Sequence, residues 1–479
     1  MTLKPLLSWL PVLSGQIWLL AGGRLLSQLG TGFTLFYAPI FFVQQVGLSA
    51  TEVGLALGSG SLAGVLGRFL SGVLCDSPQA GRRSALLLSA AIAAIADIFL
   101  ATAANLPGLV LGNLCMGLGI GLYWPATETV VADLTQPEQR SEAFAVTRVS
   151  DSVGLGLGVI LAGLWLQWTQ NYHLLFVVDG ISFVIFLGLV FLFIKETRPD
   201  RSPQSPDASR STQPDRSPLD SIDRSTGPVP RLQEIPQTRS GFRLWPSLRS
   251  SLRTSLDPLI HDRALQVFLG ANILFTTYLS QIQSTLPLYL SQGQDSTTGT
   301  PWFSAAVISR LFAWHVVLTA VLQLPVARGL KTWGHVGSLR LSAGLWALAF
   351  VGVGLLGRAM AQTTELAAIG VVTLAFGLLA LLAMAVVSYL PAAAALVVNL
   401  APPAQRGTYL ALSSQCWAVG YFLGPPLGGY ALDQGVAIAQ GFWWGLAGSV
   451  LGLQFALQWL AQRSQAQGQK HGNSRSESP

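Results

Sequence analysis

Four charged residues fall inside stretches that are otherwise apolar: Arg24, Glu128, Arg148 and Asp151. Arg148 and Asp151 are spaced i,i+3, so they would share one face of a helix. A carboxylate beside an arginine at low dielectric constant changes its charge state when the distance between them changes. We therefore predict that the four residues form one buried network. Its first possible role is proton coupling or substrate contact, with Glu128 and Asp151 as the preferred proton sites. A static, neutralised network that only fixes helix packing is the alternative, and the residue types leave both open.

Two further titratable residues lie in apolar stretches. Asp97 and His315 are each placed well inside a predicted helix, where a charge is costly unless it faces a cavity or a partner. A single histidine in such a helix is more often a hydrogen-bonded packing residue. Both rank below the four charged residues as sites of proton chemistry.

A hinge between two apolar stretches carries a third cluster, formed by Gly72, Asp76, Gly81, Arg82 and Arg83. The aspartate can accept hydrogen bonds from a helix N-terminus or pair with an arginine. Gly72 permits close helix approach, Gly81 supplies the turn, and the arginines stay at the level of the lipid headgroups. The plainer interpretation is a topology signal that keeps this loop inside the cell. The aspartate and the paired glycines exceed what such a signal needs.

The composition indicates that these residues lie on helices that span a membrane. The chain has 479 residues, of which 51% are hydrophobic and only 10% charged, far from the soluble average. Apolar runs of roughly 20 residues, enough to cross a bilayer, recur along nearly the whole chain. We predict an all-α integral membrane protein with twelve spans: Ile17–Val43, Glu52–Leu74, Ser84–Ala103, Pro107–Val131, Glu142–Leu166, Tyr172–Ile194, Ala264–Leu290, Trp302–Arg328, Val336–Leu356, Leu366–Val387, Thr408–Leu432 and Phe442–Ala461.

The spans divide into two sets. The segment between the sets is rich in Ser, Pro, Arg and Asp, so it has too few apolar residues to bury a core. We predict a six-helix bundle over 1–194, a disordered linker over 195–263, a second six-helix bundle over 264–461 and a disordered tail over 462–479. Lys and Arg fall on one side of this scheme, apart from Arg358, so both termini and the linker are predicted to be cytoplasmic.

The two bundles are predicted to be repeats. Tyr123-Trp-Pro125-Ala126 recurs as Tyr389-Leu-Pro391-Ala392. At the same offset, Leu134-x-x-Pro137-x-Gln139-Arg140 recurs as Leu400-x-x-Pro403-x-Gln405-Arg406. The register continues through the glycines, where Gly154, Gly158 and Gly163 correspond to Gly420, Gly424 and Gly429. Identities at one fixed offset indicate a duplicated six-helix unit.

Three of the charged positions of the first half have uncharged counterparts in the second half. At the same offset, Glu128, Arg148 and Asp151 correspond to Ala394, Ser414 and Trp417. The helices can therefore be built without charges at these positions. The second-half equivalent of the hinge, 323–334, has no aspartate in the matching place.

Six plus six helices with a cytoplasmic linker resemble the major facilitator superfamily. The hinge is similar to that family's signature G-x-L-x-D-x-x-x-x-G-R-R/K, matched by Gly72, Leu74, Asp76, Gly81, Arg82 and Arg83. The resemblance implies that this loop acts as a cytoplasmic latch that favours the outward-open state. Residues around Asp262-Arg263, Gln281, 286–290 and 150–154 resemble bacterial drug-efflux members of the family.

The chain departs from those drug-efflux members at two points. Antiporters of the family carry G-P-x-x-G-G in span five, whereas the fuller version here, Gly424-Pro-Pro-Leu-Gly428-Gly429, lies in span eleven. Proton-coupled drug exporters carry an arginine four residues before a glycine in span four, and here Asn113 stands before Gly117. Both departures weaken the antiporter inference. If proton coupling occurs, Arg148 or Arg24 is expected to replace the missing arginine.

The resemblance also implies a central cavity lined by spans one, four, seven and ten. Aromatic and amide side chains near mid-span suit a mixed apolar and polar pocket, although each taken alone is as typical of packing. The candidates are Gln28, Phe33, Tyr37, Tyr123, Trp124, Tyr278, Gln281, Tyr389 and Gln415.

Enzyme chemistry has no support in the sequence. The chain has no H-E-x-x-H, no P-loop and no metal-ligand cluster among its five histidines, so we expect neither a cofactor nor a metal. We predict a monomeric secondary transporter of a bacterial inner membrane that exports small amphipathic molecules in exchange for protons and does not bind nucleic acid. Facilitated import of a metabolite, or a transport-inactive receptor or scaffold, are the alternatives.

Overall fold

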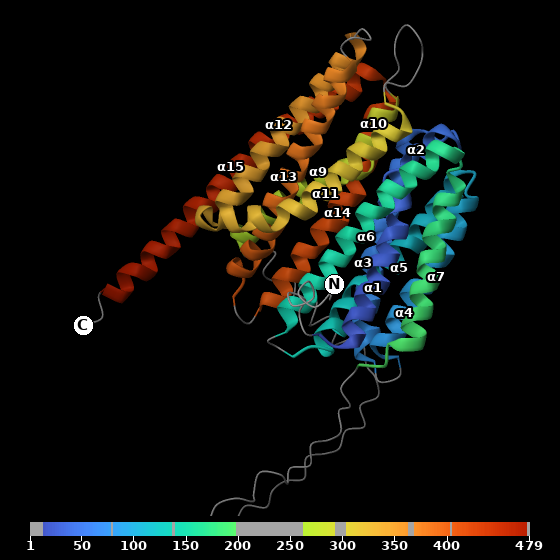
Figure 1. Ribbon diagram of the computed structural model, residues 1–479. Coiled ribbons are helices and arrows are strands. Elements are labelled where there is room, and N and C mark those ends of the chain that lie inside the picture. Colours follow the sequence, from blue (N-terminus) through green and yellow to red (C-terminus); the bar gives the residue numbers. More distant parts are fainter. Residues whose placement is uncertain are drawn as a thin grey trace, which may run out of the picture. The chain divides into compact units, whose positions relative to one another are not determined.

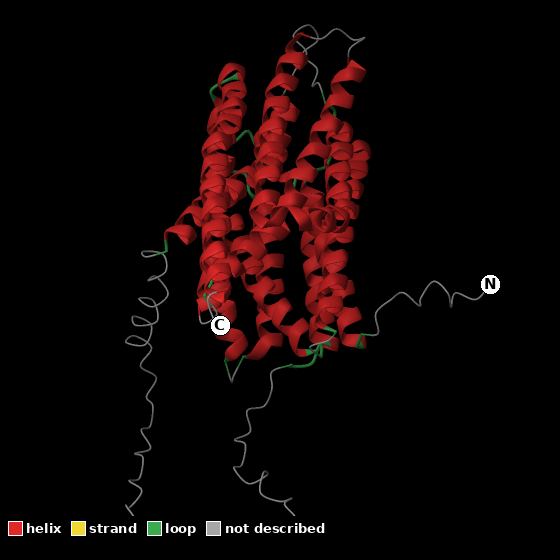
Figure 2. Cartoon of the chain, turned by 90° about the vertical axis from the view of Figure 1, so that its left-hand side faces the viewer, coloured by secondary structure: helices red, strands yellow, loops and turns green. Residues whose placement is uncertain are grey.

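The computed structural model describes residues 13–77, 80–136, 139–197, 262–292, 303–362, 368–402 and 405–476. Helices joined by short loops make up this part of the chain, and no strand occurs in it (Figure 2). The all-α prediction is confirmed. Most of the predicted linker, 198–261, lies outside the described residues.

The first half runs from blue to green in Figure 1. Its first span is divided in two, with Pro39 in the opening turn of the second piece, a position that proline tolerates because the amide there has no helical partner. Ser49 and Glu52 cap the next helix reciprocally. The helices are α1 (Gly15–Thr34), α2 (Ala38–Gln44), α3 (Ala50–Asp76), α4 (Gly81–Thr102), α5 (Leu106–Asp133), α6 (Arg140–Thr169) and α7 (His173–Phe193).

The second half runs from yellow-green to red in Figure 1. Its first span is likewise divided, between Gln283 and Thr285. The elements are α9 (Arg263–Gln283), α10 (Thr285–Gln292), α11 (Ala305–Gly329), the 3-10 helix η1 (Leu330–Trp333), α12 (Gly334–Gln362), α13 (Ala368–Leu400), α14 (Arg406–Asp433) and α15 (Val436–Ser476).

The tail predicted as disordered over 462–479 is helical as far as Ser476. That prediction is wrong for most of the segment. Residues 462–476 contain no proline, and Gln, Ala and Arg have high helix propensity. The segment therefore adds to an existing helix without the cost of a new nucleus.

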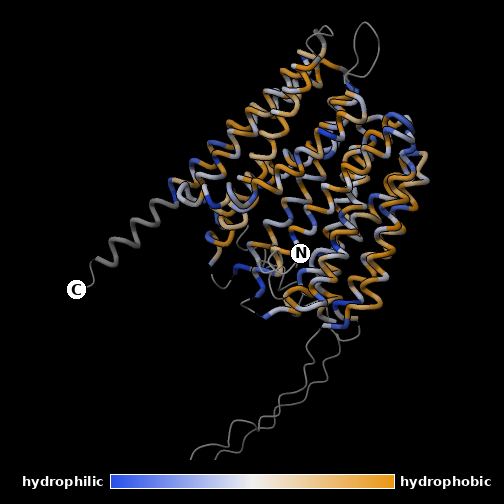
Figure 3. The backbone as a smooth tube through the Cα atoms, in the orientation of Figure 1, coloured by the Kyte–Doolittle hydropathy of each residue, from blue (hydrophilic) through white to orange (hydrophobic). Residues whose placement is uncertain are grey.

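Ten helices in the described part of the chain are long and apolar enough to cross a membrane. Apolar residues predominate along the helices in Figure 3. The two other predicted spans correspond to α9–α10 and α14, which are more polar. Their polar side chains are covered by protein: Asn272, Thr276 and Gln281 of α9 are each at most 2% exposed. A helix packed in this way needs less apolar surface than one surrounded by lipid.

Glycines set how closely the helices pack. In the first half, Gly158 of α6 lies against the backbone of α1 at Leu29, and in the second half Gly424 of α14 lies against Ser280 of α9. The corresponding glycines thus serve the corresponding helix pair in each half. Close approach through small residues is how membrane helices associate without a hydrophobic driving force between them.

The halves contact each other through α3 with α14 and through α6 with α11. Gly54 faces the carbonyl of Pro425, and Gly429 faces the carbonyl of Ala50. Asp433 at the end of α14 accepts hydrogen bonds from the amides of Ala50 and Thr51 at 2.9 and 2.8 Å, which caps α3. These close contacts lie near the start of α3, at the predicted outer side of the membrane.

Candidate functional site

The centre of the first half is an ion pair between α1 and α6. The guanidinium of Arg24 donates two hydrogen bonds to the carboxylate of Asp151, from Nε to Oδ1 at 2.9 Å and from Nη2 to Oδ2. The side chains are 2% and 13% exposed. Gly154, which lies against the backbone of α1 at Leu25, brings the two helices close enough for this pair to form. Bidentate arginine–carboxylate pairs of this kind are the stronger charge-assisted hydrogen bonds.

Arg24 also faces two aromatic rings of α5. Its guanidinium carbon lies 5.9 Å from the centroid of the Tyr123 ring and 5.3 Å from that of the Trp124 ring. Attraction between a cation and an aromatic face is stronger when water is excluded. Two residues predicted to line the cavity therefore lie beside the arginine predicted to serve coupling.

Glu128 and Arg148 form a separate pair. Glu128 Oε1 and Arg148 Nη2 are 3.5 Å apart, and the side chains are 47% and 65% exposed. The prediction of one buried network is therefore wrong: the four charges divide into a buried pair and an exposed pair. Glu128 lies close to the end of α5 and Arg148 close to the start of α6, where the helices approach the loop that joins them. Exposed pairs contribute little to stability.

Six of the nine predicted cavity residues are buried, and three of these, all tyrosines, form hydrogen bonds to another helix. Tyr278 bonds Ser449 at 2.6 Å, and Tyr389 donates to Asn272 Oδ1 at 2.5 Å. The hydroxyl of Tyr37 bonds Ser309 of α11 in the other half. Phe33 and Gln281 are also buried. Gln28, Trp124 and Gln415 are half-buried.

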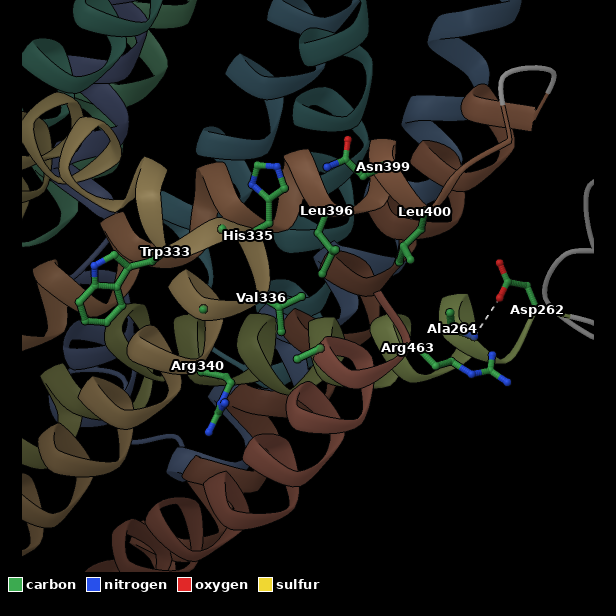
Figure 4. A pocket seen from close by; sticks show the side chains of 13 residues that line it. Asp262, Ala264, Trp333, His335, Val336, Arg340, Leu396, Asn399, Leu400 and Arg463 are labelled. Atoms are coloured by element: carbon green, nitrogen blue, oxygen red, sulfur yellow. Dashed lines mark hydrogen bonds between the residues drawn. The ribbon is translucent and has the colours of Figure 1, made fainter. Parts of the chain in front are cut away.

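A cavity of about 620 Å³ lies in the second half, at the predicted cytoplasmic ends of its helices. Its wall includes His335 and Arg340 of α12, Arg463 of α15 and Asp262, whose carboxylate caps α9 (Figure 4). None of the nine predicted cavity residues lines it.

The two lower-ranked titratable residues differ. His315 is buried, and its Nδ1 lies 3.1 Å from the carbonyl oxygen of Leu379, as a packing histidine would. Asp97 is buried on α4 and lies against α7, next to Asp179. Asp179 is not among the residues predicted from the sequence, although a carboxylate inside such an apolar helix is a signal for a functional site.

The model of one family matches most of the chain. Its description is Major Facilitator Superfamily, and it matches residues 20–382. The chain belongs to the major facilitator superfamily.

Two relatives that match over most of the chain are drug-resistance proteins. A "Multidrug resistance protein MdtH" of Photorhabdus laumondii is 24% identical over 403 residues, which is 83% of this chain and 82% of that one. The MdtH of Aeromonas hydrophila is 26% identical over 425 residues, which is 87% of this chain and 89% of that one. A crystal structure of a mutant of the nucleoside transporter NupG matches with a TM-score of 0.69 at 15% identity, covering 93% of this chain and 99% of that one. This structural likeness shows the fold.

The superfamily signature loop is tied to its own half. Gly81, at φ +78°, turns the chain into α4, and Glu196 accepts hydrogen bonds from the amides of Arg82 and Arg83 at 2.9 and 3.1 Å. Arg82 Nε lies 2.5 Å from Asp133 Oδ2 of α5, and Arg83 donates to the carbonyl of Phe191 of α7 at 2.6 Å. The arginines therefore fasten α4 to α5 and α7.

Two details of the loop were not foreseen. Sequence reasoning missed Glu196 and Asp133, because both lie far along the chain from the signature. A side chain at Gly72 would meet no atom within 4 Å, so the expected close helix approach at this glycine is absent from the structure. The side chain of Asp76 lies outside the described part of the chain.

Proposed function

We propose that this superfamily member exports small amphipathic compounds in exchange for protons, by alternating access between its two halves. The buried Arg24–Asp151 pair carries the proposal. A proton taken up by Asp151 removes the charge that holds Arg24, and the arginine is then free to leave α6. Because α1 and α6 are packed at this point, the charge state of one carboxylate acts directly on the contact between two helices.

The exposed pair supplies the second part of the mechanism. Glu128 of α5 interacts electrostatically with Arg24. The ion-pair partner of Glu128 is Arg148, which lies on α6. When Arg24 leaves Asp151, Glu128 is the carboxylate that receives it. Glu128 and Asp151 thereby exchange a cation as protons enter and leave, with Arg148 paired to Glu128 until then.

The substrate would lie between the halves. Trp124, Gln28 and Gln415 are half-buried and offer both ring and amide contacts to an amphipathic molecule. The hydrogen bond between Tyr37, which precedes α2, and Ser309 of α11 joins the two halves, so it must break when the outer side opens. The remaining predicted cavity residues would become accessible in that other conformation.

The drug-resistance relatives support the direction and compound class. The MdtH proteins match this chain over most of their own length. On this proposal the protein is a monomer in a bacterial inner membrane with both termini in the cytoplasm, as the distribution of Lys and Arg predicts. It needs no cofactor.

Transport by purified protein in proteoliposomes tests the proposal. Asp151→Asn and Glu128→Gln should each abolish accumulation of a cationic amphipathic dye driven by a pH gradient, while equilibrium exchange of the dye continues. Ser414→Ala, at the second-half position that corresponds to Arg148, is the matched control and should keep both activities. Uphill transport by both acidic variants would refute these proton sites. Binding of the dye without any counterflow by the unmutated protein would instead indicate a receptor.

A further inference from the structure

Two aspartates meet inside the first half, away from the Arg24–Asp151 pair. Asp97 of α4 is 2% exposed and Asp179 of α7 is 1% exposed. A Cβ atom built on Gly180 would lie 3.2 Å from Asp97 Cβ and 3.9 Å from Asp97 Oδ2. Asp97 therefore packs directly on the residue that follows Asp179, and the two carboxylates interact electrostatically.

Few hydrogen bonds reach these carboxylates. The hydroxyl of Thr34 on α1 donates to Asp179 Oδ2 at 2.8 Å. Within the described ranges of the chain, neither oxygen of Asp97 has a hydrogen-bond partner, nor does Asp179 Oδ1. A Cβ atom on Gly30 would lie 2.8 Å from Asp179 Oδ1, so this glycine leaves α1 without a side chain at that oxygen. Three buried carboxylate oxygens are thus unsatisfied.

None of the ion pairs formed by the described charged groups on the surrounding helices involves Asp97 or Asp179. On α1, Arg24 pairs with Asp151, and on α5 Tyr123 lies beside Arg24 while Glu128 pairs with Arg148. At the start of α7, His173 Nδ1 lies 2.9 Å from the carbonyl oxygen of Ala101. Arg82 and Arg83 lie at the opposite end of α4, and Arg68 of α3 forms no ion pair among the described residues. Among the residues that the structure describes, no cationic side chain therefore forms an ion pair with either aspartate.

Two adjacent ionised carboxylates are not stable in such a place. Burial removes the hydration of both charges, and the charges repel each other at low dielectric constant. One proton removes one charge and provides an O–H donor for an unsatisfied oxygen. Divalent ions such as Mg²⁺ and Ca²⁺ take six or more oxygen ligands, twice the number of unsatisfied oxygens here.

We propose that Asp97 and Asp179 bind one proton between them, and that this pair is a second proton site of the first half, distinct from Arg24–Asp151. Asp97 lies within two turns of the end of α4 and Asp179 within two turns of the start of α7, at the predicted outer side. Glu128 and Asp151 lie nearer the predicted cytoplasmic ends of α5 and α6. The inference holds whatever molecule the protein transports.

Infrared spectroscopy of the full-length protein in lipid tests the proposal without a substrate. At neutral pH the unmutated protein should show the C=O absorption of a buried protonated carboxyl, shifted when H₂O is replaced by D₂O. The double variant Asp97→Asn, Asp179→Asn should lose this band. Asp151→Asn should keep it, because Asp151 lies apart from the two aspartates and both of its oxygens accept hydrogen bonds from Arg24. Absence of the band from the unmutated protein, or its persistence in the double variant, overturns the proposal.

A second measurement uses the unmutated protein and so does not depend on the folding of a variant. Dicyclohexylcarbodiimide reacts with protonated carboxyl groups in apolar surroundings, and mass spectrometry of the peptides locates the adduct. The expected result is labelling of Asp97 or Asp179 that declines as the pH rises, with no labelling of Asp151. Loss of labelling in NaCl but not in choline chloride at constant pH would show that the site binds Na⁺, and the proton proposal would fail.

Discussion

The two halves use the same three helices to build a polar centre, but only the first half makes it charged. In the first half, Arg24 of α1 binds Asp151 of α6 and faces Tyr123 of α5. In the second half, Asn272 of α9 donates to the side chain of Ser413 on α14 at 3.2 Å and accepts from Tyr389 of α13. The neutral version joins the corresponding helices, so the charges of the first half are not required for packing. This difference argues for a functional role of the charged pair.

Substitutions in the polar centre should cause the largest loss of stability, and the loss should be much larger in the first half than in the second. Asp151→Ala leaves Arg24 buried without a partner, and loss of one member of a buried pair costs about 3–5 kcal/mol. Ser413→Ala removes a neutral hydrogen bond worth about 1 kcal/mol. Thermal unfolding of the purified variants measures both. Equal shifts in Tm would show that the charged pair is no more important to stability than its neutral counterpart.

The glycines offer a second contrast between the halves. A Cβ on Gly158 would overlap the backbone carbonyl of Leu29, whereas a Cβ on Gly424 would overlap the Ser280 hydroxyl. A side chain can rotate away and a helix backbone cannot, so Gly158→Ala should lose about 1–3 kcal/mol of stability and Gly424→Ala less. Gly156→Ala is the control, because its Cβ would meet only Val316 at 3.5 Å. A larger Tm loss for Gly424→Ala would contradict the prediction.

Two tyrosines distinguish contacts between the halves from contacts within one half. Tyr37 bonds Ser309 across the halves, and Tyr278 bonds Ser449 within the second half. Tyr37→Phe removes a bond worth about 1 kcal/mol from only one conformation, so it should shift the population several-fold toward opening on the outer side. Tyr278→Phe should leave the population unchanged. Spin-label distances across the outer ends of α2 and α11 report the shift.

Substitutions in the hinge between α3 and α4 should have the smallest effect, and that effect is on the conformational populations. Asp76→Asn is expected to reduce the outward-open population, since the latch is predicted to lie in the first half alone. Arg328→Gln, in the second half where the matching aspartate is absent, should change little. Accessibility of a single cysteine at the cytoplasmic end of α3 measures both variants. Equal effects would refute the predicted asymmetry of the latch.

Local signals in the sequence account for much of the fold and part of the site. The signature loop and the repeated glycines are each encoded within a short stretch, and the structure places the glycines at corresponding helix contacts. Asp179 and Glu196 were missed because neither has a local signal. Asp179 is notable only because it lies next to Asp97 on another helix. Glu196 is notable only because it accepts hydrogen bonds from amides of the signature loop, far away in the chain.

By itself, the sequence determined the helical class, the order of the helices, the duplication and the membership of the family. Apolar length and a fixed repeat offset are properties of the chain that need no contacts between distant residues. The tertiary structure alone decided that Arg24 pairs with Asp151, that Glu128 and Arg148 stay exposed, and that Asp97 meets Asp179. The reason is that partners are chosen by the rotation of each helix about its axis and by how closely its neighbours pack, and both depend on glycine contacts between helices far apart in the sequence.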